Sequence, residues 1–273
     1  GANRLRRQVI ARPQAPANTP RPPVHSMGAE IPTMLHALID PKRTVRQIGD
    51  QLYSALPEGD EGAPYDAYAA AYDRAVSTPA YLRIAWGISR ADNAGFVRAA
   101  FESNESGWLV DIAAGSCVDS AAAYAETERP TIVLDRSVAM LEKGIERLTE
   151  VAGRIPPNIV FLQADAKALP LRSSSVKTVL CHGAYHVFDE TRAITSEWRR
   201  TLEEDGTTFV SSIVRGRWIG DRYLSLLARS GEIAPPRSVA EFVTALEENL
   251  GETVDVASVG NFAYARTRSS SLR

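Results

Sequence analysis

The sequence of 273 residues is poor in cysteine and lysine and lacks a long apolar run. Its two cysteines are too few for a disulfide framework, which favours a reducing compartment and predicts a cytoplasmic location. No uncharged apolar stretch approaches the roughly 18 residues of a membrane-spanning helix, so we expect no membrane span. The formal charge of −2 argues against a broad nucleic-acid surface. The length allows one large domain or two small ones.

Residues 1–29 differ in composition from the rest of the chain. They hold five arginines, five prolines and no acidic residue. Proline at this density opposes helices and sheet ladders, so we expect an extended or disordered arm. An acid-free, arginine-rich segment is also typical of an organelle transit peptide, but the prolines oppose the amphipathic helix that such a peptide needs.

Residues 30–105 carry mainly helical signals, and we interpret them as a helical or lid region. Leu35, Leu38 and Ile39 share one helical face, and Pro41 suits the first turn of a second helix that would run past Leu52. The stretch 57–64 is rich in glycine, proline and acid, which indicates a linker. Further helices are expected over 64–75, 79–86 and 90–102.

From residue 107 short β-rich runs alternate with helical stretches. Such alternation predicts an α/β fold with a doubly wound, mostly parallel sheet behind an N-terminal helical extension. Ser238 and Glu241 form a capping box for a helix that Gly251 ends, and an antiparallel strand pair, 253–259 and 261–267, follows. The other expected strands are 108–112, 131–135, 158–162, 176–182 and 207–214, with helices over 117–126, 137–151 and 189–203.

The residues that follow these strands point to a nucleotide. Parallel strands of open α/β sheets bind ligands at their carboxyl ends. Asp135 ends the second strand, 24 residues after Asp111, and a carboxylate there suits the two hydroxyls of a ribose. The phosphate-binding motifs G-x-G-x-x-G and G-x-x-x-x-G-K-[ST] are absent, and Asp111 would repel a diphosphate. These features favour a cationic nucleoside derivative that carries no phosphate, and S-adenosylmethionine is such a molecule.

Residues 107–214 resemble the class I S-adenosylmethionine-dependent methyltransferases, in particular the ubiquinone/menaquinone-biosynthesis-like branch that acts on small molecules. The resemblance implies a Rossmann-like sheet of seven strands with an antiparallel final strand, in a domain over 106–268 with an acceptor-side insert at 216–238. It also implies S-adenosylmethionine as cofactor and S-adenosylhomocysteine as product. The motifs, in chain order, are LVDIAAGS (109–116), IVLDRSVAMLEKGIERL (132–148), FLQADAKALPL (161–171), VLCHGAYHVFDE (179–190) and EWRRTLEEDGTTFVSS (197–212).

The resemblance assigns expected roles to individual residues of the cofactor site. Asp111, Ala113 and Gly115 would line the methionine part of the cofactor, and Asp135 would hold the ribose hydroxyls. Arg136 and Met140 would flank the adenine, and Asp165 and Ala166 would recognise its edge. Cys181 and His182 would lie beneath the transferred methyl, and Tyr72 would belong to a lid.

The sequence signals for catalytic residues and for acceptor-binding residues are less specific. His182 and His186 are candidate general bases, with a pocket-lining or core role as the alternative. Tyr65 and Tyr68 suit either a lid over an apolar acceptor or a packed core. Further acceptor contacts are expected in the insert from Trp218, Arg222 and Tyr223. No cluster of His, Cys, Asp or Glu has the spacing of metal ligands, so no metal is predicted.

Two departures from the family pattern leave a second hypothesis open. Ala113 and Cys117 stand where the family has the first and third glycines of its loop. Because alanine favours negative φ, we expect a slightly different loop path. The main interpretation is in-line methyl transfer to a small molecule. The alternative is a catalytically degenerate member that binds the cofactor or a partner, and a homodimer is also left open.

Overall fold

The computed structural model describes residues 33–60, 69–104, 106–231 and 233–268, and these residues are built around one sheet of nine strands. The strands from β2 to β7 along the sheet are parallel, whereas β1, β9 and β8 are antiparallel to their neighbours. The order across the sheet is β1 (Arg46–Gly49), β2 (Leu52–Ser54), β5 (Ile159–Gln163), β4 (Thr131–Asp135), β3 (Leu109–Ile112), β6 (Val176–Cys181), β7 (Leu202–Ile213), β9 (Phe262–Thr267) and β8 (Val254–Val259).

This arrangement confirms the expected mostly parallel α/β sheet with an antiparallel pair at its end. The turn between β8 and β9 contains Gly260, whose φ of 57° is left-handed. A Cβ there would lie 2.2 Å from the Trp86 carbonyl oxygen, so only glycine fits this turn. The expected number of strands was wrong, because the hairpin of β1 and β2 adds two strands to the predicted seven.

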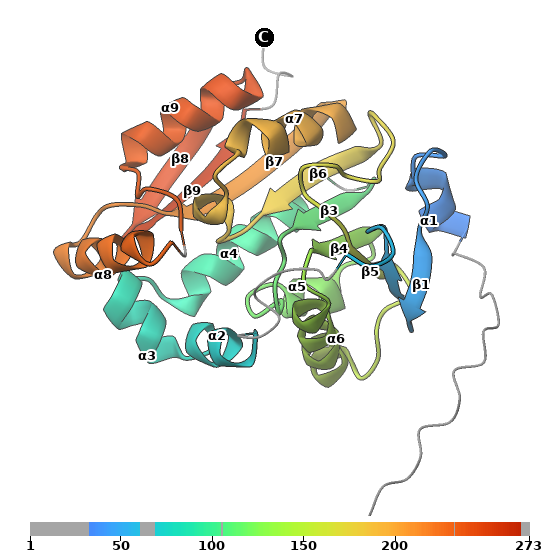
Figure 1. Cartoon of the computed structure of the whole chain (residues 1–273), viewed down its shortest axis with the longest axis horizontal. Helices are drawn as coiled ribbons and strands as arrows, with labels where there is room; N and C mark the ends of the chain where they lie inside the picture. Colours follow the sequence, from blue (N-terminus) through green and yellow to red (C-terminus); the bar gives the residue numbers. More distant parts are fainter. Residues whose placement is uncertain (1–32, 61–68, 105, 232, 269–273) are drawn as a thin grey trace, which may run out of the picture. The chain divides into compact units, whose positions relative to one another are not determined.

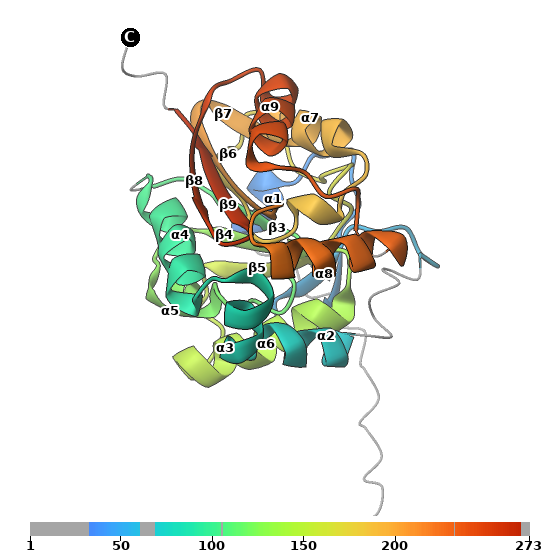
Figure 2. The ribbon, with the colours of Figure 1, turned by 90° about the vertical axis from the view of Figure 1, so that its left-hand side faces the viewer.

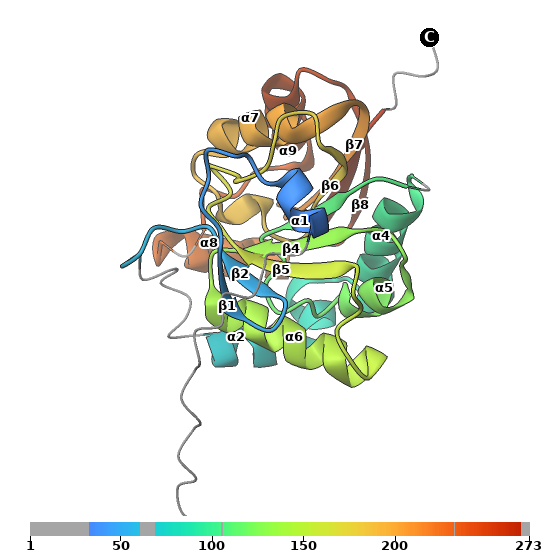
Figure 3. The same ribbon diagram turned by 90° about the vertical axis from the view of Figure 1, so that its right-hand side faces the viewer.

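The helix expected from Pro41 is also wrong, and the same hairpin takes its place. β2 pairs in parallel with the edge of β5, and all three of its residues are buried. The Ser54 hydroxyl donates to Gln163 Oε1 at 2.8 Å, which adds a side-chain link between the strands. The open hydrogen-bonding edge of β5 thus overrides a helical spacing of apolar residues. The preceding helix is confirmed as α1 (Thr33–Leu38), beside this edge in Figure 3.

Helices cover both faces of the sheet, as Figure 1 shows. One core cluster joins alternate strand residues such as Val110 to Trp198 and Phe242, and the other joins Leu109 to Tyr124. Coverage on both faces explains why the central strands are buried at every residue rather than at alternate ones. The covering helices are α7 (Thr191–Thr201) and α9 (Val239–Leu250) on one face, and α4 (Arg90–Glu102), α5 (Ala121–Glu126) and α6 (Val138–Ala152) on the other.

A third group of helices lies beside the main layers. The expected helix over 79–86 divides into a single turn, α3 (Pro79–Tyr81), and a π-helical turn, η2 (Leu82–Trp86). Within the insert, α8 (Trp218–Arg229) packs against η2. α2 (Ala69–Val76) precedes them, and the earlier part of its expected range lies outside the described residues. Among the described helices, none combines the length and apolar character needed to cross a bilayer.

Two helical glycines give a test of how tightly α6 packs. A Cβ on Gly144 would lie 2.7 Å from Cys117 Sγ and 3.2 Å from the Phe161 ring, whereas a Cβ on Gly95 of α4 would meet no atom of the described residues within 4 Å. Alanine gains about 1 kcal/mol of helix propensity over glycine. We therefore expect Gly95→Ala to raise the free energy of unfolding by about 0.5–1 kcal/mol. Gly144→Ala should lower it by about 1–2 kcal/mol, because overpacking outweighs the gain. Urea titration measures both, and equal stabilisation would contradict the close contact.

Candidate active site

The candidate site lies where the order of the strands reverses. Along the sheet β3 lies between β4 and β6. The chain that leaves the carboxyl end of β3 continues to β4 on one side, and the chain that leaves the carboxyl end of β6 continues to β7 on the other. Such a switch point is where open α/β sheets bind ligands. The segments that meet there are the loop 113–117 after β3, the end of β4 at Asp135 and the turn after β6 at His182. Figure 1 shows β3 between β4 and β6.

The loop after β3 has left-handed backbone at alternate residues. The φ angles are 58° at Ala113, 56° at Gly115 and 57° at Cys117. Alanine and cysteine here adopt a conformation that costs an L-residue roughly 1–2 kcal/mol. Ala113 therefore adopts a left-handed φ although alanine favours negative values. Backbone strain of this kind is often found at functional sites.

The carboxylate of Asp135 holds this loop to the end of β4. Its Oδ2 accepts a hydrogen bond from the Gly115 N–H at 2.9 Å, and its Oδ1 accepts one from the Ser137 N–H at 2.9 Å. Ser137 also caps α6, because its hydroxyl accepts from the Met140 N–H at 3.1 Å. The side chain of Met140 is buried below this cap. Predicted residues of the first two strands are thus brought together.

Asp111 is buried at the end of β3. The Tyr124 hydroxyl donates to its Oδ2 at 2.5 Å, while its Oδ1 has no hydrogen-bond partner among the described residues. Burial raises the pKa of Asp111 to about 7. Tyr124 was not expected in the site, because in the sequence it looks like any apolar-face residue of α5.

An ion-pair group lies where the adenine edge is expected. Arg136 Nη2 donates to both oxygens of Asp60 at 2.9 and 3.0 Å, and Nη1 donates to Asp165 at 3.1 Å. The second oxygen of Asp165 accepts from the Lys167 N–H at 2.9 Å, and Ala166 packs against the core between them. Asp60 belongs to the N-terminal extension and was missed, since its linker-like surroundings in the sequence carry no signal.

His182 has both ring nitrogens partnered. Ser211 Oγ lies 2.8 Å from Nδ1, and Asp119 Oδ2 lies 3.4 Å from Nε2. Ser211 Oγ already accepts from the Gly183 N–H at 2.7 Å, so we assign its proton to Nδ1 and the imidazole proton to Nε2, facing Asp119. Hydrogen bonds at both ring nitrogens therefore hold the imidazole of His182 in one orientation, which is compatible with a pocket-lining role.

Asp119 is held from three sides and was not expected from the sequence. Arg90 Nη1 lies 2.6 Å from Oδ1, and Asn93 Nδ2 donates to Oδ2 at 2.9 Å. Burial raises the pKa of Asp119, but the hydrogen bond from His182 and the charge of Arg90 outweigh it, so the pKa lies below its usual value. Asp119 therefore presents a fixed negative charge to the imidazole.

His186 and the two cysteines have surroundings typical of core residues. His186 Nδ1 accepts from the Ile213 N–H at 3.4 Å, and burial lowers the pKa of His186 to about 4, so the ring is neutral at pH 7. Cys181 packs in the core cluster with Val110, whereas Cys117 packs in the cluster on the other face of the sheet. The two thiols therefore pack as small buried side chains on opposite faces of the sheet.

The predicted acceptor residues separate into two groups. Tyr223 lies on the inner side of α8, where its ring is 5.2 Å from Trp86 and its hydroxyl 3.4 Å from that of Tyr81. Trp218 is 69% exposed and Arg222 is also exposed, so both point away from Tyr223. The other candidates, Tyr65, Tyr68 and the side chain of Tyr72, lie outside the described residues.

An unexpected contact joins α2 to the strained loop. The Ser116 hydroxyl donates to Asp73 Oδ1 at 2.5 Å, and Arg147 Nη2 of α6 donates to the same oxygen at 3.0 Å. Burial raises the pKa of Asp73, but the hydrogen bonds from Ser116 and Arg147 outweigh it and hold the pKa below its usual value. The helix that carries Tyr72 is thus fixed directly to the loop after β3.

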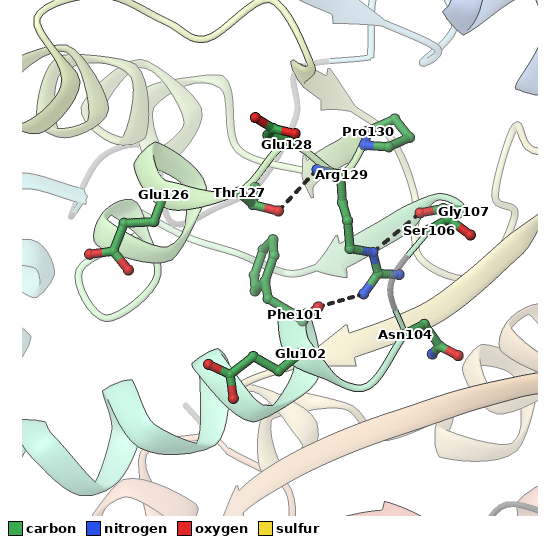
Figure 4. Close-up of a pocket in the computed structure, with 10 residues that line it drawn as sticks. All are labelled: Phe101, Glu102, Asn104, Ser106, Gly107, Glu126, Thr127, Glu128, Arg129 and Pro130. Carbon is green, nitrogen blue, oxygen red and sulfur yellow. Dashed lines mark hydrogen bonds between the residues drawn. The ribbon is translucent and has the colours of Figure 1, made fainter.

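A cavity of about 560 Å³ lies at the opposite, amino ends of β3 and β4 (Figure 4). Its buried cation, Arg129, donates to the Phe101 carbonyl at 2.9 Å, to the Gly107 carbonyl at 3.3 Å and to the Thr178 hydroxyl at 2.9 Å. These bonds occupy the guanidinium with structural carbonyls at the end of α4, where a cation is favourable. The cavity is therefore not the candidate active site.

Comparison with known proteins agrees with the geometry of the switch point. Residues 109–206, which span β3 to the first half of β7, match the protein family described as "Methyltransferase domain". A search of curated sequences found no match. Residues 109–206 form a methyltransferase domain. The domain, on a class I Rossmann-like fold, indicates S-adenosylmethionine as the cofactor, and the match includes Asp111, Asp135, Asp165 and His182.

Solved structures of methyltransferases share the fold at low sequence identity. A chain of the Haloferax volcanii complex between the Trm112 methyltransferase activator and a methyltransferase is 17% identical, over 75% of this chain and 95% of that one, with a TM-score of 0.57. An S-adenosylmethionine-dependent methyltransferase of Thermotoga maritima is 17% identical, over 74% and 96%, with a TM-score of 0.54. DhpI, solved with S-adenosylhomocysteine, is 21% identical, over 75% and 93%, with a TM-score of 0.53.

The strain in the loop predicts the effect of restoring glycine. Ala113→Gly should raise the free energy of unfolding by about 0.5–1 kcal/mol, because relief of the left-handed strain exceeds the added flexibility of the unfolded chain. Ala114→Gly is the matched control, since Ala114 is not among the positive-φ residues, and it should lower stability by a similar amount. Thermal unfolding of both variants gives the comparison, and a loss of stability in Ala113→Gly would show that the alanine is unstrained.

The pKa of Asp111 predicts a pH dependence of stability. Between the unfolded value near 3.8 and the folded value of about 7, only the folded state retains this proton, so its contribution to stability falls as the pH rises. Asp111→Asn stays neutral, so its stability relative to the unchanged protein should grow from pH 4 to pH 8, by up to about 4 kcal/mol. Tyr124→Phe removes a hydrogen bond that lowers this pKa and should move the window to higher pH. A stability difference independent of pH would contradict the shift.

Proposed function

We propose that this protein transfers a methyl group from S-adenosylmethionine to a small-molecule acceptor by in-line displacement. The observation that carries the proposal is the meeting of Asp111, the left-handed loop 113–117 and Asp135 at the switch point of a methyltransferase domain. The small acceptor is supported by the resemblance to the ubiquinone/menaquinone-like branch and by the near-neutral charge of the chain. Two free, buried thiols fit the cytoplasm, where cysteines stay reduced.

The residues present fit a cationic cofactor. Asp111 Oδ1 is buried without a hydrogen-bond partner in the part of the chain that the structure describes, and a positive charge nearby would stabilise its ionised form. No described residue fills the space that a Cβ on Gly115 would take, which lets a ligand approach the backbone closely. Asp135 carries a second carboxylate at the same loop. When bound there, S-adenosylmethionine supplies a methyl group activated by a sulfonium.

The chain's own residues bind and orient rather than activate. In this proposal Asp135 accepts the ribose hydroxyls, and Arg136, which donates to Asp165, lines the adenine edge with it. His182 lies after β6, where the transferred methyl is expected, with its proton held toward Asp119. This pattern favours His182 as an oriented wall of the acceptor side rather than a free base. Alignment of the acceptor would then provide much of the acceleration.

The alternative is a catalytically degenerate member of the same fold that binds the cofactor or a partner without turnover. A turnover assay separates the two hypotheses. Release of S-adenosylhomocysteine across a panel of small acceptors would support catalysis. Tight cofactor binding with no release across the panel would favour the alternative.

Calorimetry tests the cofactor site directly. Asp135→Ala should weaken S-adenosylmethionine binding by about 1–3 kcal/mol, because it removes charge-assisted hydrogen bonds. Asp135→Asn keeps one acceptor oxygen and should have a smaller effect. Asp205→Ala is the control, since that carboxylate is 71% exposed and lies near the amino end of β7, and it should leave the affinity unchanged. Absence of any binding heat with the unchanged protein would overturn the proposal.

A further inference from the structure

The outward face of α8 combines exposed apolar side chains with arginines. Trp218 is 69% exposed, Leu226 61% and Ile219 37%, which is unusual for large apolar residues close together. Helical spacing puts Arg222 and Arg229 on the same face. The opposite face of the helix is buried, with Leu224 in the core and Gly220 against Asn261.

The neighbouring π-helical turn η2 extends this surface. Ile84 of η2 is 66% exposed, and the exposed Arg83 precedes it. Arg217, just before α8, donates to the Arg83 carbonyl at 3.3 Å and so joins the two elements. In Figure 2 α8 faces the viewer. We name the α8 face by these residues: Arg83, Ile84, Arg217, Trp218, Ile219, Arg222, Leu226 and Arg229.

The α8 face is cationic although the chain as a whole is slightly acidic. Among the described residues, no carboxylate lies within ion-pair distance of these four arginines. The single acid of α8, Asp221, is turned inward and accepts from the Gly216 N–H and from Asn261 Nδ2, both at 2.8 Å. The arginine charges are therefore available to an anionic partner.

We propose that the α8 face binds an anionic lipid surface. Tryptophan, leucine and isoleucine between arginines are the composition of helices that lie in the membrane–water interface. The apolar side chains enter the headgroup region while the arginine stems bury beside them and keep their guanidinium groups at the lipid phosphates. The arginines and the apolar side chains alternate along one stripe of the helix. This arrangement favours a lipid surface over an acidic protein segment, since a lipid surface presents apolar and anionic groups along the whole stripe. The inference does not depend on methyl transfer.

Vesicle binding by the full chain tests the proposal, read by flotation and by tryptophan emission. Of the four tryptophans, Trp86 and Trp198 are buried and Trp108 is half-buried, so Trp218 is the most exposed and the part of the shift that Trp218→Phe removes reports on it. We expect binding to vesicles that contain phosphatidylserine, a blue shift of the emission and little binding to pure phosphatidylcholine. Arg222→Glu with Arg229→Glu should reduce binding by roughly tenfold or more, since each arginine near an anionic surface contributes about 1 kcal/mol.

Matched variants separate the α8 face from the rest of the chain. Trp218→Ser with Leu226→Ser should also lose binding, whereas Val151→Ser and Arg154→Glu, exposed on and just after α6, should not. Trp218→Phe should keep binding and lose the blue shift. Binding that survives the α8 substitutions would assign it to another part of the chain, such as the arginines of residues 1–29, and would overturn the proposal. Binding to an acidic peptide in preference to vesicles would overturn it in favour of a protein partner.

Discussion

The bonds of the Asp135 carboxylate are the constraint on which the site depends. One oxygen fixes the Gly115 N–H of the loop after β3, and the other fixes the Ser137 N–H at the start of α6. A charge-assisted pair of bonds of this kind ties two strand ends together and holds left-handed backbone at Ala113 and Cys117. The conformation that glycine would adopt without strain is here imposed on two other residues by their surroundings.

The N-terminal extension reaches the same site from two directions. Asp60 pairs with Arg136 at the expected adenine edge, and Asp73 of α2 accepts from Ser116 and Arg147 beside the loop. The hairpin of β1 and β2 anchors the extension by adding to the edge of β5. What looks like an appendage in the sequence is therefore bonded both to the loop after β3 and to the residue that follows β4.

The other side of the switch point is built from aromatic rings and one hydrogen-bonded imidazole. His182 is held by Ser211 and Asp119, with Phe96 6.0 Å away and Phe262 6.4 Å away between ring centroids. Tyr223 continues this aromatic layer to α8. One helix thus packs against this aromatic layer with its inner face and presents arginines and apolar side chains with its outer face.

The sequence by itself determined the parallel sheet, the capped helix ended by Gly251 and the strand ends at Asp111 and Asp135, because these depend on local periodicity and on turn and cap chemistry. Only the tertiary structure decided that residues 46–54 are strands, because the free edge of β5 outweighs a weak helical spacing. It also decided the partners of His182, the separation of the two cysteines and the outward direction of Trp218. Each depends on contacts between segments far apart in the chain, which no local pattern encodes.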